Sequence, residues 1–292
     1  MKTLIRSDSS STIGLGHIMR DIVFAKECEG EVLFACQNLE GNINNRIPYP
    51  VHILFSNEPK ELIELIKSLH VEMLVIDHYG IDASFEQKVK EETGVKILSF
   101  DDTYEKHYCD ILLNHNISAN KKRYENLVPK ECVLRCGEPL IRDEFKEEKK
   151  QKRKKIYDVL VAMGGTDPTN TTLAILKTLP ISLHVSVLTT SANAHLEELE
   201  AFVKENTNIS LHVNSQEVAK LLHQSRLAIV TPSVMVHEVL FMEAPFIAIK
   251  VAQNQDDMYR YLKKNGFKVY KDFEEWYDYV LKHNAGVYNV LQ

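Results

Sequence analysis

Short apolar runs rich in valine, isoleucine and leucine alternate along the chain with longer amphipathic stretches. This alternation is typical of βαβ units, in which helices join parallel strands and cover the faces of their sheet. The stretch 59–70, PKELIELIKSLH, predicts one such helix, because proline suits a first helical position and the apolar residues form one stripe. In the first half of the chain, the predicted strands span residues 3–8, 31–36, 51–54, 73–78, 96–100 and 110–114.

The segment 146–155, KEEKKQKRKK, interrupts this pattern with charged residues and predicts an exposed linker or a solvated helix. Because the alternation then resumes, we predict an α/β protein with two Rossmann-like domains, residues 1–148 and 149–292. A chain of 292 residues supports this division, since it exceeds what one hydrophobic core usually serves. The last helix is a candidate to pack back onto the N-terminal domain. The strands predicted in the second half span residues 157–163, 183–189, 209–213, 227–231 and 246–250.

Composition narrows the classes of partner. A formal net charge of −6 gives the whole protein no attraction to nucleic acid or anionic lipid, although the basic segment 146–155 keeps nucleic-acid binding open for that stretch. The chain has no run of about 18 apolar residues, and Lys2 leads directly into a predicted strand. We therefore expect a cytoplasmic protein that binds a small molecule and neither spans nor coats a membrane.

Cysteines and histidines give no sign of a metal site. The five cysteines are odd in number and form no CxxC pair, which predicts buried, reduced thiols instead of a disulfide framework or a zinc site. The histidines show no ligand spacing such as HExxH. We therefore expect neither a metal nor another cofactor.

The segment SSTIGLGHIMRD follows the first predicted strand and leads into a helix, at the edge of the sheet where α/β proteins bind ligands. Gly14 and Gly16 allow positive φ and close backbone approach, and the helix N-terminus offers N–H groups to an anion. The partial positive charge of this terminus should lower the pKa of His17 and keep its ring neutral, able to accept a proton. The competing interpretation is that His17 caps the turn or hydrogen-bonds Asp8.

Two arginines accompany this glycine segment, Arg6 in the strand before it and Arg20 in the helix after it. Their guanidinium groups could balance the charge of a phosphate bound at the loop. They could equally form structural ion pairs with Asp8 and Asp21. The residue types fit both interpretations, and both remain open at this point.

A second glycine turn, AMGGTDPTNTT, ends the strand that opens the second half. Gly164 and Gly165 permit the turn, while Asp167 and Pro168 suit the cap and the first position of a helix. Free N–H groups and the hydroxyl of Thr166 could then hold a phosphate, although an ordinary turn would look the same. The loop lacks the lysine of a GxxxxGK[ST] motif and no GxGxxG occurs, which disfavours ATP hydrolysis and dinucleotide binding.

A third region, residues 231–257, joins a strand, a helix, another strand and a polar loop. Ser233 can cap this helix, so Glu238 lies on its second turn and can accept hydrogen bonds from the diol of a ribose. Asn254 and Gln255 end the loop, where their amides could reach a sugar or a phosphate. A solvent-facing carboxylate and ordinary polar loop residues are the structural alternatives.

These motifs together resemble a known family. RSDSSSTIGLGHIMRD, DHYG at 77–80, LLN at 112–114, RDEF at 142–145, MGGTD at 163–167 and the SxxxxE…NQ region are similar to the UDP-2,4-diacetamido-2,4,6-trideoxy-β-L-altropyranose hydrolases of pseudaminic acid biosynthesis. More remotely, the second half is similar to the nucleotide-sugar half of the N-acetylglucosaminyltransferase that makes lipid II. The resemblance covers most of the chain. It implies a GT-B architecture with two domains facing across a cleft.

The resemblance also implies the division of labour within the protein. The C-terminal domain would hold UDP, sugar chemistry would occur in the cleft without metal, and the product would feed flagellin glycosylation. We further expect a monomer. The UDP-binding role falls on Gly164, Gly165, Thr166, Ser233, Glu238 and Gln255. The sugar-binding role falls on Gly14, Gly16, Arg20, Tyr79, Asn114 and Asn254.

A mechanism follows that needs few catalytic groups. His17 would take a proton from a water that attacks the anomeric carbon opposite UDP, which predicts inversion. The alternative makes His17 a donor to phosphate or hydroxyl and assigns water activation to Asp8 or Asp77. The segment GEPLIRDEF is shorter than the family pattern, so Arg142 and Glu144 receive no role from the resemblance.

Two other classes of function compete with hydrolysis. A GT-B glycosyltransferase that uses a UDP-N-acetylated sugar would turn over only when an acceptor is present. A non-catalytic UDP-sugar-binding protein would bind without turnover and would not need His17. The histidine favours an enzyme.

Overall fold

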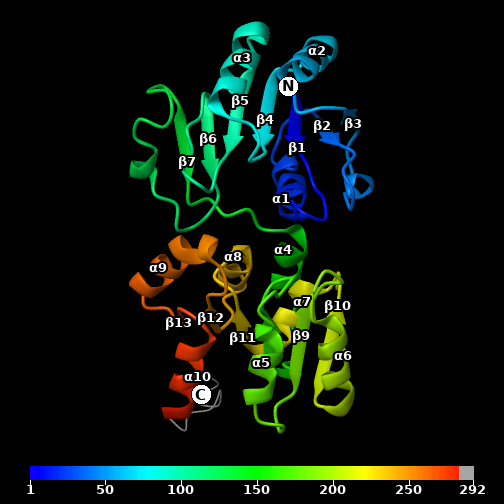
Figure 1. Ribbon diagram of the computed structural model, residues 1–292, viewed down its shortest axis with the longest axis vertical. Helices are drawn as coiled ribbons and strands as arrows, with labels where there is room; N and C mark the ends of the chain where they lie inside the picture. The colour runs from blue at the N-terminus through cyan, green and yellow to red at the C-terminus, as the bar shows by residue number, and fades with distance from the viewer. Residues whose placement is uncertain (283–292) are drawn as a thin grey trace. The chain divides into compact units, whose positions relative to one another are not determined.

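The computed structural model describes residues 1–282 and divides the chain into two compact units, Met1–Leu140 and Ile141 onward. Each unit is built on its own parallel sheet with helices packed against it (Figure 1). The division falls eight residues before the position expected from the charged segment. The difference arises because helix α4 (Asp143–Lys149) packs against α7 (Val218–His223) of the second unit.

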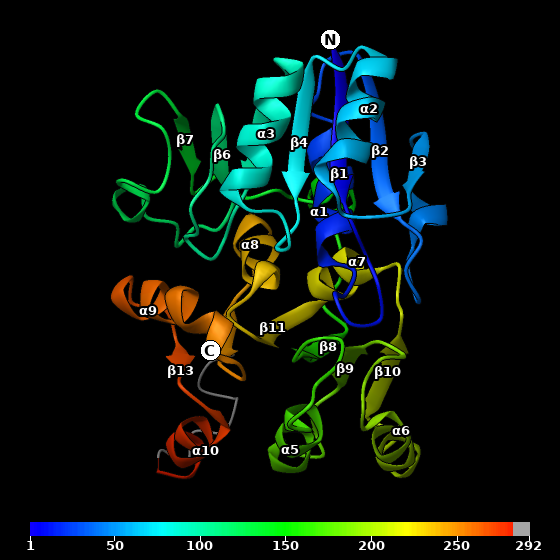
Figure 2. The same cartoon turned by 45° about the horizontal axis from the view of Figure 1, so that its top comes forward.

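The sheet of the first unit has the strand order β3-β2-β1-β4-β5-β6-β7, and all of its neighbouring strands are parallel. The arrowheads of β2 and β4 point the same way in Figure 2. In register, Leu4 of the central strand lies opposite Leu33 on one side and Leu74 on the other. The strands are β1 (Lys2–Ser7), β2 (Glu31–Gln37), β3 (Val51–Leu54), β4 (Met73–Asp77), β5 (Lys96–Phe100), β6 (Ile111–Asn114) and β7 (Val133–Cys136).

Helices cover both faces of this sheet. The helix predicted at 59–70 is present as α2 (Pro59–Leu69), which buries Leu62, Ile63 and Ile66 in one apolar cluster together with residues of α3 (Ala83–Thr93). Helix α1 (Gly16–Ala25) contributes to a second cluster that includes Phe34 and Val75. Two short 3-10 helices, Asn44–Arg46 and Lys121–Tyr124, lie in the connecting loops.

The second unit repeats this plan with the strand order β10-β9-β8-β11-β12-β13, again parallel throughout. Its first strand, β8, is central like β1 of the first unit. The strands are β8 (Tyr157–Ala162), β9 (Val185–Thr189), β10 (Ile209–Val213), β11 (Ser225–Val230), β12 (Phe246–Ile249) and β13 (Val269–Tyr270). The prediction of an α/β protein with two Rossmann-like domains is therefore confirmed.

The helices of the second unit are, besides α4 and α7, α5 (Thr171–Thr178), α6 (Leu196–Glu205), α8 (Val234–Phe241), α9 (Asp256–Lys264) and α10 (Phe273–Lys282), with a 3-10 helix at Gln253–Gln255. The last of these, α10, packs against α5 and β13 and buries Trp276 in the core of its own unit. The packing expected for the end of the chain, onto the N-terminal domain, stays a prediction. Residues 283–292 lie outside the described chain.

Three local details differ from the sequence prediction. Strands β7 and β13 were not predicted, because one is short and half exposed and the other has only two residues. Helix α5 begins at Thr171, so Asp167 and Pro168 are not its cap and first residue. The cap position of α5 is Asn170, which adopts φ +51°. The basic segment 146–155 begins within α4, where Glu148 is buried.

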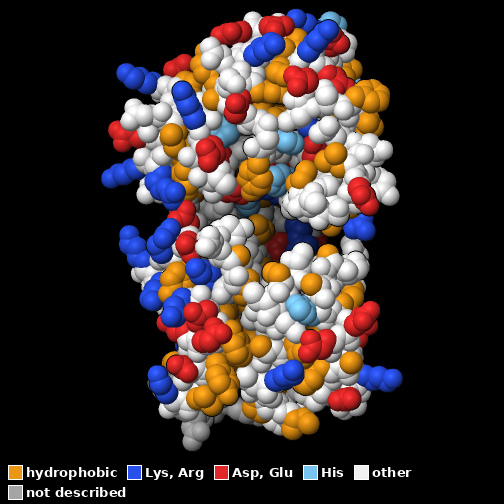
Figure 3. Space-filling view, viewed as in Figure 1, with side chains coloured by type: hydrophobic (Ala, Val, Ile, Leu, Met, Phe, Trp, Pro, Cys, Tyr) orange, Lys and Arg blue, Asp and Glu red, His pale blue; other side chains and the backbone are white. Residues whose placement is uncertain are grey.

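The surface carries charges of both signs. Lysine and arginine side chains are interspersed with aspartate and glutamate over the visible face of each unit (Figure 3). No helix among residues 1–282 is both long and apolar enough to cross a bilayer.

Candidate active site

The position of β1 in the strand order determines where the first unit can bind a ligand. The chain continues from β1 to β2 on one side and later places β4 on the other, and open α/β sheets bind ligands at this switch point, beyond the carboxyl ends of the strands. The loop after β1 holds the GLGH segment. Strand β4 ends at Asp77, and the loop after it holds His78 and Tyr79, so two distant parts of the sequence meet at one edge.

The GLGH segment forms a closed turn that ends in an uncapped helix. Gly14 has φ +86°, a conformation that favours glycine, and its N–H donates to the Ser10 carbonyl at 2.9 Å. Leu15 is the cap residue of α1 and makes no side-chain hydrogen bond to the helix, whose first turn holds no acidic residue. The N-terminus of α1 is therefore open to an anion.

His17 lies on the first turn of α1, as predicted, and the residue is 8% exposed. Its Nδ1 is 3.7 Å from Oδ1 of Asp77, and its ring meets that of Tyr79 edge to face, with centroids 4.7 Å apart. The carboxylate that His17 faces is thus Asp77, and the imidazole that lies against Asp8 is that of His78, with its Nε2 at 3.1 Å. The cap interpretation is wrong, since Leu15 holds the cap position.

Arg20, one turn after His17 on the same helix, is held by two carboxylates. Its Nε and one terminal nitrogen each donate to Asp77 at 2.5 Å, and the other terminal nitrogen donates to Asp102 at 3.0 Å. Burial alone would lower the pKa of Arg20, but the charge of Asp77 and its hydrogen bonds raise it. Arg20 thus pairs with Asp77 and Asp102 rather than with Asp8 or Asp21.

The pKa of His17 is lowered, as the sequence predicted, but for a different main reason. Burial lowers this pKa most, and the charge of Arg20 lowers it further. Asp77 and Asp102 act in the opposite direction without reversing the shift. Since Arg20 compensates both carboxylates, the imidazole is neutral at pH 7 and retains a nitrogen lone pair that can accept a proton.

Asp8 is fully engaged in structural hydrogen bonds. Arg6 donates to its two oxygens at 2.6 and 2.8 Å, the Gln37 N–H donates at 2.7 Å, and the ring of His78 lies at 3.1 Å. Gly80 N–H donates to the other nitrogen of that ring, Nδ1, which leaves Nε2 to carry the proton toward Asp8. Although burial opposes the effect, these bonds hold the pKa of Asp8 well below its usual range. Asp8 is therefore a buried ion-pair partner and is poorly suited to activate water.

Two further predicted residues of this unit have contrasting environments. Tyr79 is 65% exposed, and its hydroxyl donates to Asp102 at 2.9 Å while its ring borders His17. Asn114 is 1% exposed and donates to the hydroxyl of Tyr124 at 2.9 Å. Tyr79 is accessible to a ligand beside His17, whereas Asn114 is part of the protein interior.

In the second unit, helices α5 and α8 both begin at the carboxyl edge of the sheet, but they differ in whether a side chain bonds their first N–H groups. The sequence did not reveal this difference. Asp167 accepts the N–H groups of Thr171 and Thr172, each at 2.9 Å, and so closes the start of α5. The cap residue of α8, Ser233, makes no such bond, and its hydroxyl instead pairs with Thr231 at 2.9 Å. The N-terminus of α8 is thus the more available of the two for an anion.

The residues of the MGGTD turn surround this edge of the sheet. Gly164 has φ +97°, a conformation that favours glycine, and a side chain at Gly165 would force the side chain of Thr190 to move. Thr166 is exposed, and its carbonyl accepts the N–H of Ala194 at 3.2 Å. The turn therefore brings backbone close to any ligand that lies over β8.

Glu238 is bound by an arginine to which the sequence assigned no role. Arg142 donates from Nε and from a terminal nitrogen to the two oxygens of Glu238, at 2.6 and 2.9 Å, and its third nitrogen lies 2.6 Å from Glu144. Burial raises the pKa of Glu238, while Arg142 opposes that shift. Each carboxylate oxygen keeps a free lone pair, so Glu238 can still accept a bond from a hydroxyl that reaches it.

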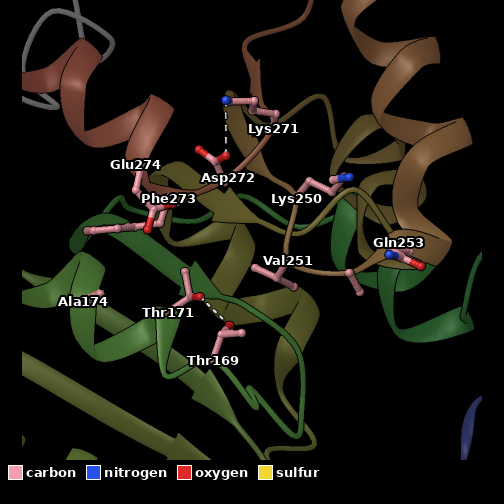
Figure 4. A pocket seen from close by; sticks show the side chains of 11 residues that line it. Thr169, Thr171, Ala174, Lys250, Val251, Gln253, Lys271, Asp272, Phe273 and Glu274 are labelled. Carbon is pink, nitrogen blue, oxygen red and sulfur yellow. Dashed lines mark hydrogen bonds and ion pairs between the residues drawn. The ribbon is translucent and has the colours of Figure 1, made fainter.

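Asn254 and Gln255 lie in the 3-10 turn after β12. Asn254 is exposed, whereas the side-chain oxygen of Gln255 accepts the N–H of Val251 at 2.9 Å and fixes the loop. Beside this loop is a cavity of about 510 Å³ (Figure 4), lined in part by Thr169, Lys250 and Lys271 from the loops after β8, β12 and β13. The sequence analysis did not single out this cavity.

The sequence reasoning missed three partners that the fold supplies. Asp102 is the second residue after β5 and joins the network of Arg20, and Asp77 was considered only as a possible base. Arg142 is 96 positions from its partner Glu238. The sequence signal that could have found the two aspartates is their position near the ends of predicted strands. Acidic residues at the carboxyl ends of adjacent parallel strands meet at one edge of the sheet. Within residues 1–282 no group of three or more His, Cys, Asp or Glu side chains could hold a metal ion.

The fold defines the class of protein. The chain matches no family model, but it resembles solved GT-B structures over its whole length. It has 12% identity and a TM-score of 0.62 to MurG of Acinetobacter baumannii, covering 100% of this chain and 92% of that one. It has 9% identity and a TM-score of 0.61 to UDP-GlcNAc 2-epimerase from Neisseria meningitidis bound to UDP-GlcNAc, covering 100% and 94%. The protein therefore has a GT-B fold.

The sequence comparison identifies the family within that class. The chain is 48% identical over 271 residues to the UDP-2,4-diacetamido-2,4,6-trideoxy-β-L-altropyranose hydrolase of Campylobacter jejuni subsp. jejuni serotype O:2. The aligned residues cover 92% of this chain and 98% of that protein. The chain belongs to this hydrolase family, as the motifs indicated.

Proposed function

We propose that the protein releases UDP from UDP-2,4-diacetamido-2,4,6-trideoxy-β-L-altropyranose by hydrolysis at the anomeric carbon. The observation that carries this proposal is a neutral, partly buried imidazole, His17, beside an open helix terminus. The name of the Campylobacter jejuni relative supplies the substrate. A UDP leaving group needs stabilisation and a positioned water, and a single proton acceptor is sufficient to activate that water.

UDP would bind to the second unit. We assign the diphosphate to the open N-terminus of α8, at Ser233, because Asp167 already occupies the N–H groups of α5. A carboxylate at that position also repels a phosphate, which favours α8 further. Gly164, Gly165 and Thr166 would border the nucleotide through their backbone.

Glu238 and Arg142 would recognise the ribose end of UDP together. The free lone pairs of Glu238 suit the ribose diol, and Arg142 opposes the rise in pKa that burial causes and holds the carboxylate in one orientation. Gln255 would act by fixing the loop after β12, while the exposed Asn254 is free to contact the sugar. This assignment gives Arg142 a positioning role that the sequence did not suggest.

In the first unit, His17 would act as the general base. Its Nδ1 side faces Asp77 at 3.7 Å, which leaves Nε2 to take the proton of the attacking water. As the ring becomes charged, Asp77 stabilises the imidazolium, and Arg20 holds Asp77 in place through two hydrogen bonds. Attack from the face opposite UDP gives inversion at the anomeric carbon.

The rival bases fit the geometry less well. Asp8 is saturated by Arg6, His78 and the backbone, and Asp77 is bound at both oxygens by Arg20. A carboxylate held this way is a weak proton acceptor, because protonation would break an ion pair. Gly14 and Gly16 would allow the loop to approach the substrate, Tyr79 would border the sugar, and Asn114 would support the loop from the interior.

The remaining features of the proposal concern the setting of the reaction. We propose a metal-independent, cofactor-free enzyme that works as a cytoplasmic monomer on a UDP-sugar, with no nucleic-acid or membrane partner. Its product would enter pseudaminic acid biosynthesis and then flagellin glycosylation. The proposed substrate class follows from the family. The proposed independence from metal rests on the chemistry of the leaving group, because hydrogen-bond donors are sufficient to stabilise UDP as it departs.

The decisive experiment determines which bond of the UDP-sugar is cleaved. The purified protein is incubated with the diacetamido UDP-sugar, a chelator and no acceptor in ¹⁸O-labelled water, and the products are followed by ³¹P and ¹H NMR. We expect free UDP without label, a sugar labelled at its anomeric hydroxyl, and initial formation of the inverted anomer. Label in UDP would place the cleavage at phosphorus. Turnover that appears only after an acceptor is added would establish a glycosyltransferase instead.

A further inference from the structure

Two of the five free thiols lie side by side at the amino ends of neighbouring strands. Cys109 comes two residues before β6 and Cys132 directly before β7, and these strands pair with Ile111 opposite Val133. The two Sγ atoms are 3.7 Å apart. Since parallel strands bring their amino ends to one edge, the approach of the thiols follows from the register of the sheet.

The two thiols differ in exposure and in chemistry. Cys109 is 0% exposed and belongs to the apolar core, whereas Cys132 is partly exposed. The hydrogen bond between them, together with burial, raises the pKa of Cys109, and the same bond lowers the pKa of Cys132. Cys132 is therefore the thiol that solvent reaches and that more readily forms the nucleophilic thiolate.

We propose that Cys109 and Cys132 are a redox modification site, which closes to an intramolecular disulfide when the protein meets hydrogen peroxide and reopens with a dithiol. In the first step the Cys132 thiolate attacks peroxide, which gives a sulfenic acid and hydroxide. In the second step the Cys109 sulfur attacks the Cys132 sulfur and water leaves. The sum converts two thiols and one peroxide into one disulfide and two waters, so electrons and protons balance.

The geometry can accommodate the bond. The sulfur atoms must approach from 3.7 Å to about 2 Å, and both cysteines precede the strands, so the ladder between β6 and β7 need not shift. The link would join the amino ends of these strands. His17 and its partners lie at the carboxyl ends of β1 and β4, so the modification should leave the proposed reaction unaffected.

The test uses the whole protein and reads the bond directly. Wild-type protein is treated with a small excess of hydrogen peroxide, its remaining thiols are alkylated, and a non-reducing digest is analysed by mass spectrometry. We expect a peptide pair that joins Cys109 to Cys132 and lacks the mass of two hydrogens, with the other thiols alkylated. Dithiothreitol should restore both thiols. Full alkylation of all five cysteines after peroxide, or a link that joins other cysteines, would overturn the proposal.

A matched pair of variants separates this site from general thiol oxidation. Cys132→Ser should abolish the linked peptide, while Cys136→Ser, a partly exposed cysteine of β7, should leave it intact. Oxidised wild-type protein should also unfold at higher urea concentration than its reduced form, because the link restricts the unfolded chain. The same link in Cys132→Ser, or an unchanged midpoint in fully linked protein, would count against the assignment. UDP release plays no part in these readouts, so failure of the proposed function would not affect them.

Discussion

His17 and His107 are buried to the same extent, each 8% exposed, yet their pKa values shift in opposite directions. Nδ1 of His107 lies 2.8 Å from Glu86, and its Nε2 is 4.0 Å from Asp101. Burial alone would lower the pKa of His107, but the nearby carboxylates of Asp101 and Glu86 raise it to about 9. His107 is thus an imidazolium at neutral pH, clamped between two carboxylates.

The difference between these two histidines lies in whether their carboxylates are already compensated. Asp77, the partner of His17, gives both oxygens to Arg20, so little negative charge is left to attract a proton. Glu86 accepts bonds from Ser99 and from the Tyr108 N–H, which are neutral, and its charge is free to hold the imidazolium. Whether an arginine lies beside the carboxylate therefore decides the role of each histidine. His17, whose carboxylate is paired with Arg20, is a proton acceptor, and His107, whose carboxylate has no such arginine, is a structural cation.

The largest expected effect in this comparison comes from His17→Asn, which removes the proton acceptor and keeps a polar side chain. We expect kcat for UDP release to fall by roughly 10²- to 10⁴-fold, the contribution typical of a general base. The matched control is His107→Asn, which alters an equally buried histidine and should leave kcat of the folded protein nearly unchanged. Steady-state assays of both variants near neutral pH, with circular dichroism to verify folding, test this contrast. An equal loss of kcat in the two folded variants would show that His17 has no catalytic role that His107 lacks.

Arg20→Gln should make the environment of His17 resemble that of His107. The change leaves Asp77 as a buried, uncompensated charge, which should cost about 3–5 kcal/mol of unfolding free energy. It should also raise the pKa of His17, so the acid limb of the pH profile of kcat/KM moves to higher pH. Arg20→Lys, which keeps the charge, is the control and should move the limb less. A limb that stays in place in Arg20→Gln would mean that His17 does not respond to Asp77.

The charge on His107 should make stability depend on alkaline pH. Its pKa is 6.5 in the unfolded reference and about 9 in the folded protein, so the stabilisation is fully present below pH 6.5 and is lost as the pH rises through 9. The difference corresponds to about 3 kcal/mol. Urea unfolding of the wild type across this range should show the loss, and His107→Asn should start less stable and lack that slope. Parallel slopes in the two proteins would contradict a charged His107.

The smallest effect is expected from Tyr79→Phe. This change keeps the ring against His17 and removes only the hydrogen bond to Asp102, which should cost about 1 kcal/mol in stability and little in kcat. Tyr79→Ala removes the ring and exposes His17 to water, so the acid limb should move to higher pH because burial contributes less. Identical pH profiles for the two variants would show that Tyr79 does not shield His17.

Much of the fold was predictable because it depends on local patterns. The α2 helix follows from Pro59 and an apolar stripe, and the inner strands β4 and β8 contain apolar runs buried on both faces. Edge strands lack that signal, since β7 is half exposed and β13 has two residues. The start of α5 was misplaced because Asp167 lies outside the helix, where Asn170 is the cap residue, and reaches the N–H groups of Thr171 and Thr172 through its side chain alone.

The candidate site was predictable only where its residues are close in sequence. The GLGH turn and the place of His17 on α1 follow from glycine conformations and helix periodicity. The pairings of Arg20 with Asp77 and of Arg142 with Glu238 span 57 and 96 positions, so they depend on the final strand order. The direction of the pKa shift of His17 was predicted correctly, but its largest cause is burial, which only a packed structure shows.

The central place of β1 and β8 has a consequence for synthesis on the ribosome. β1 ends at Ser7 and its second neighbour, β4, begins only at Met73, so the middle of the sheet emerges first and waits for both flanks. The second unit repeats this delay between β8 and β11. In each half of the nascent chain, the central strand therefore has an unpaired edge until the fourth strand has left the exit tunnel.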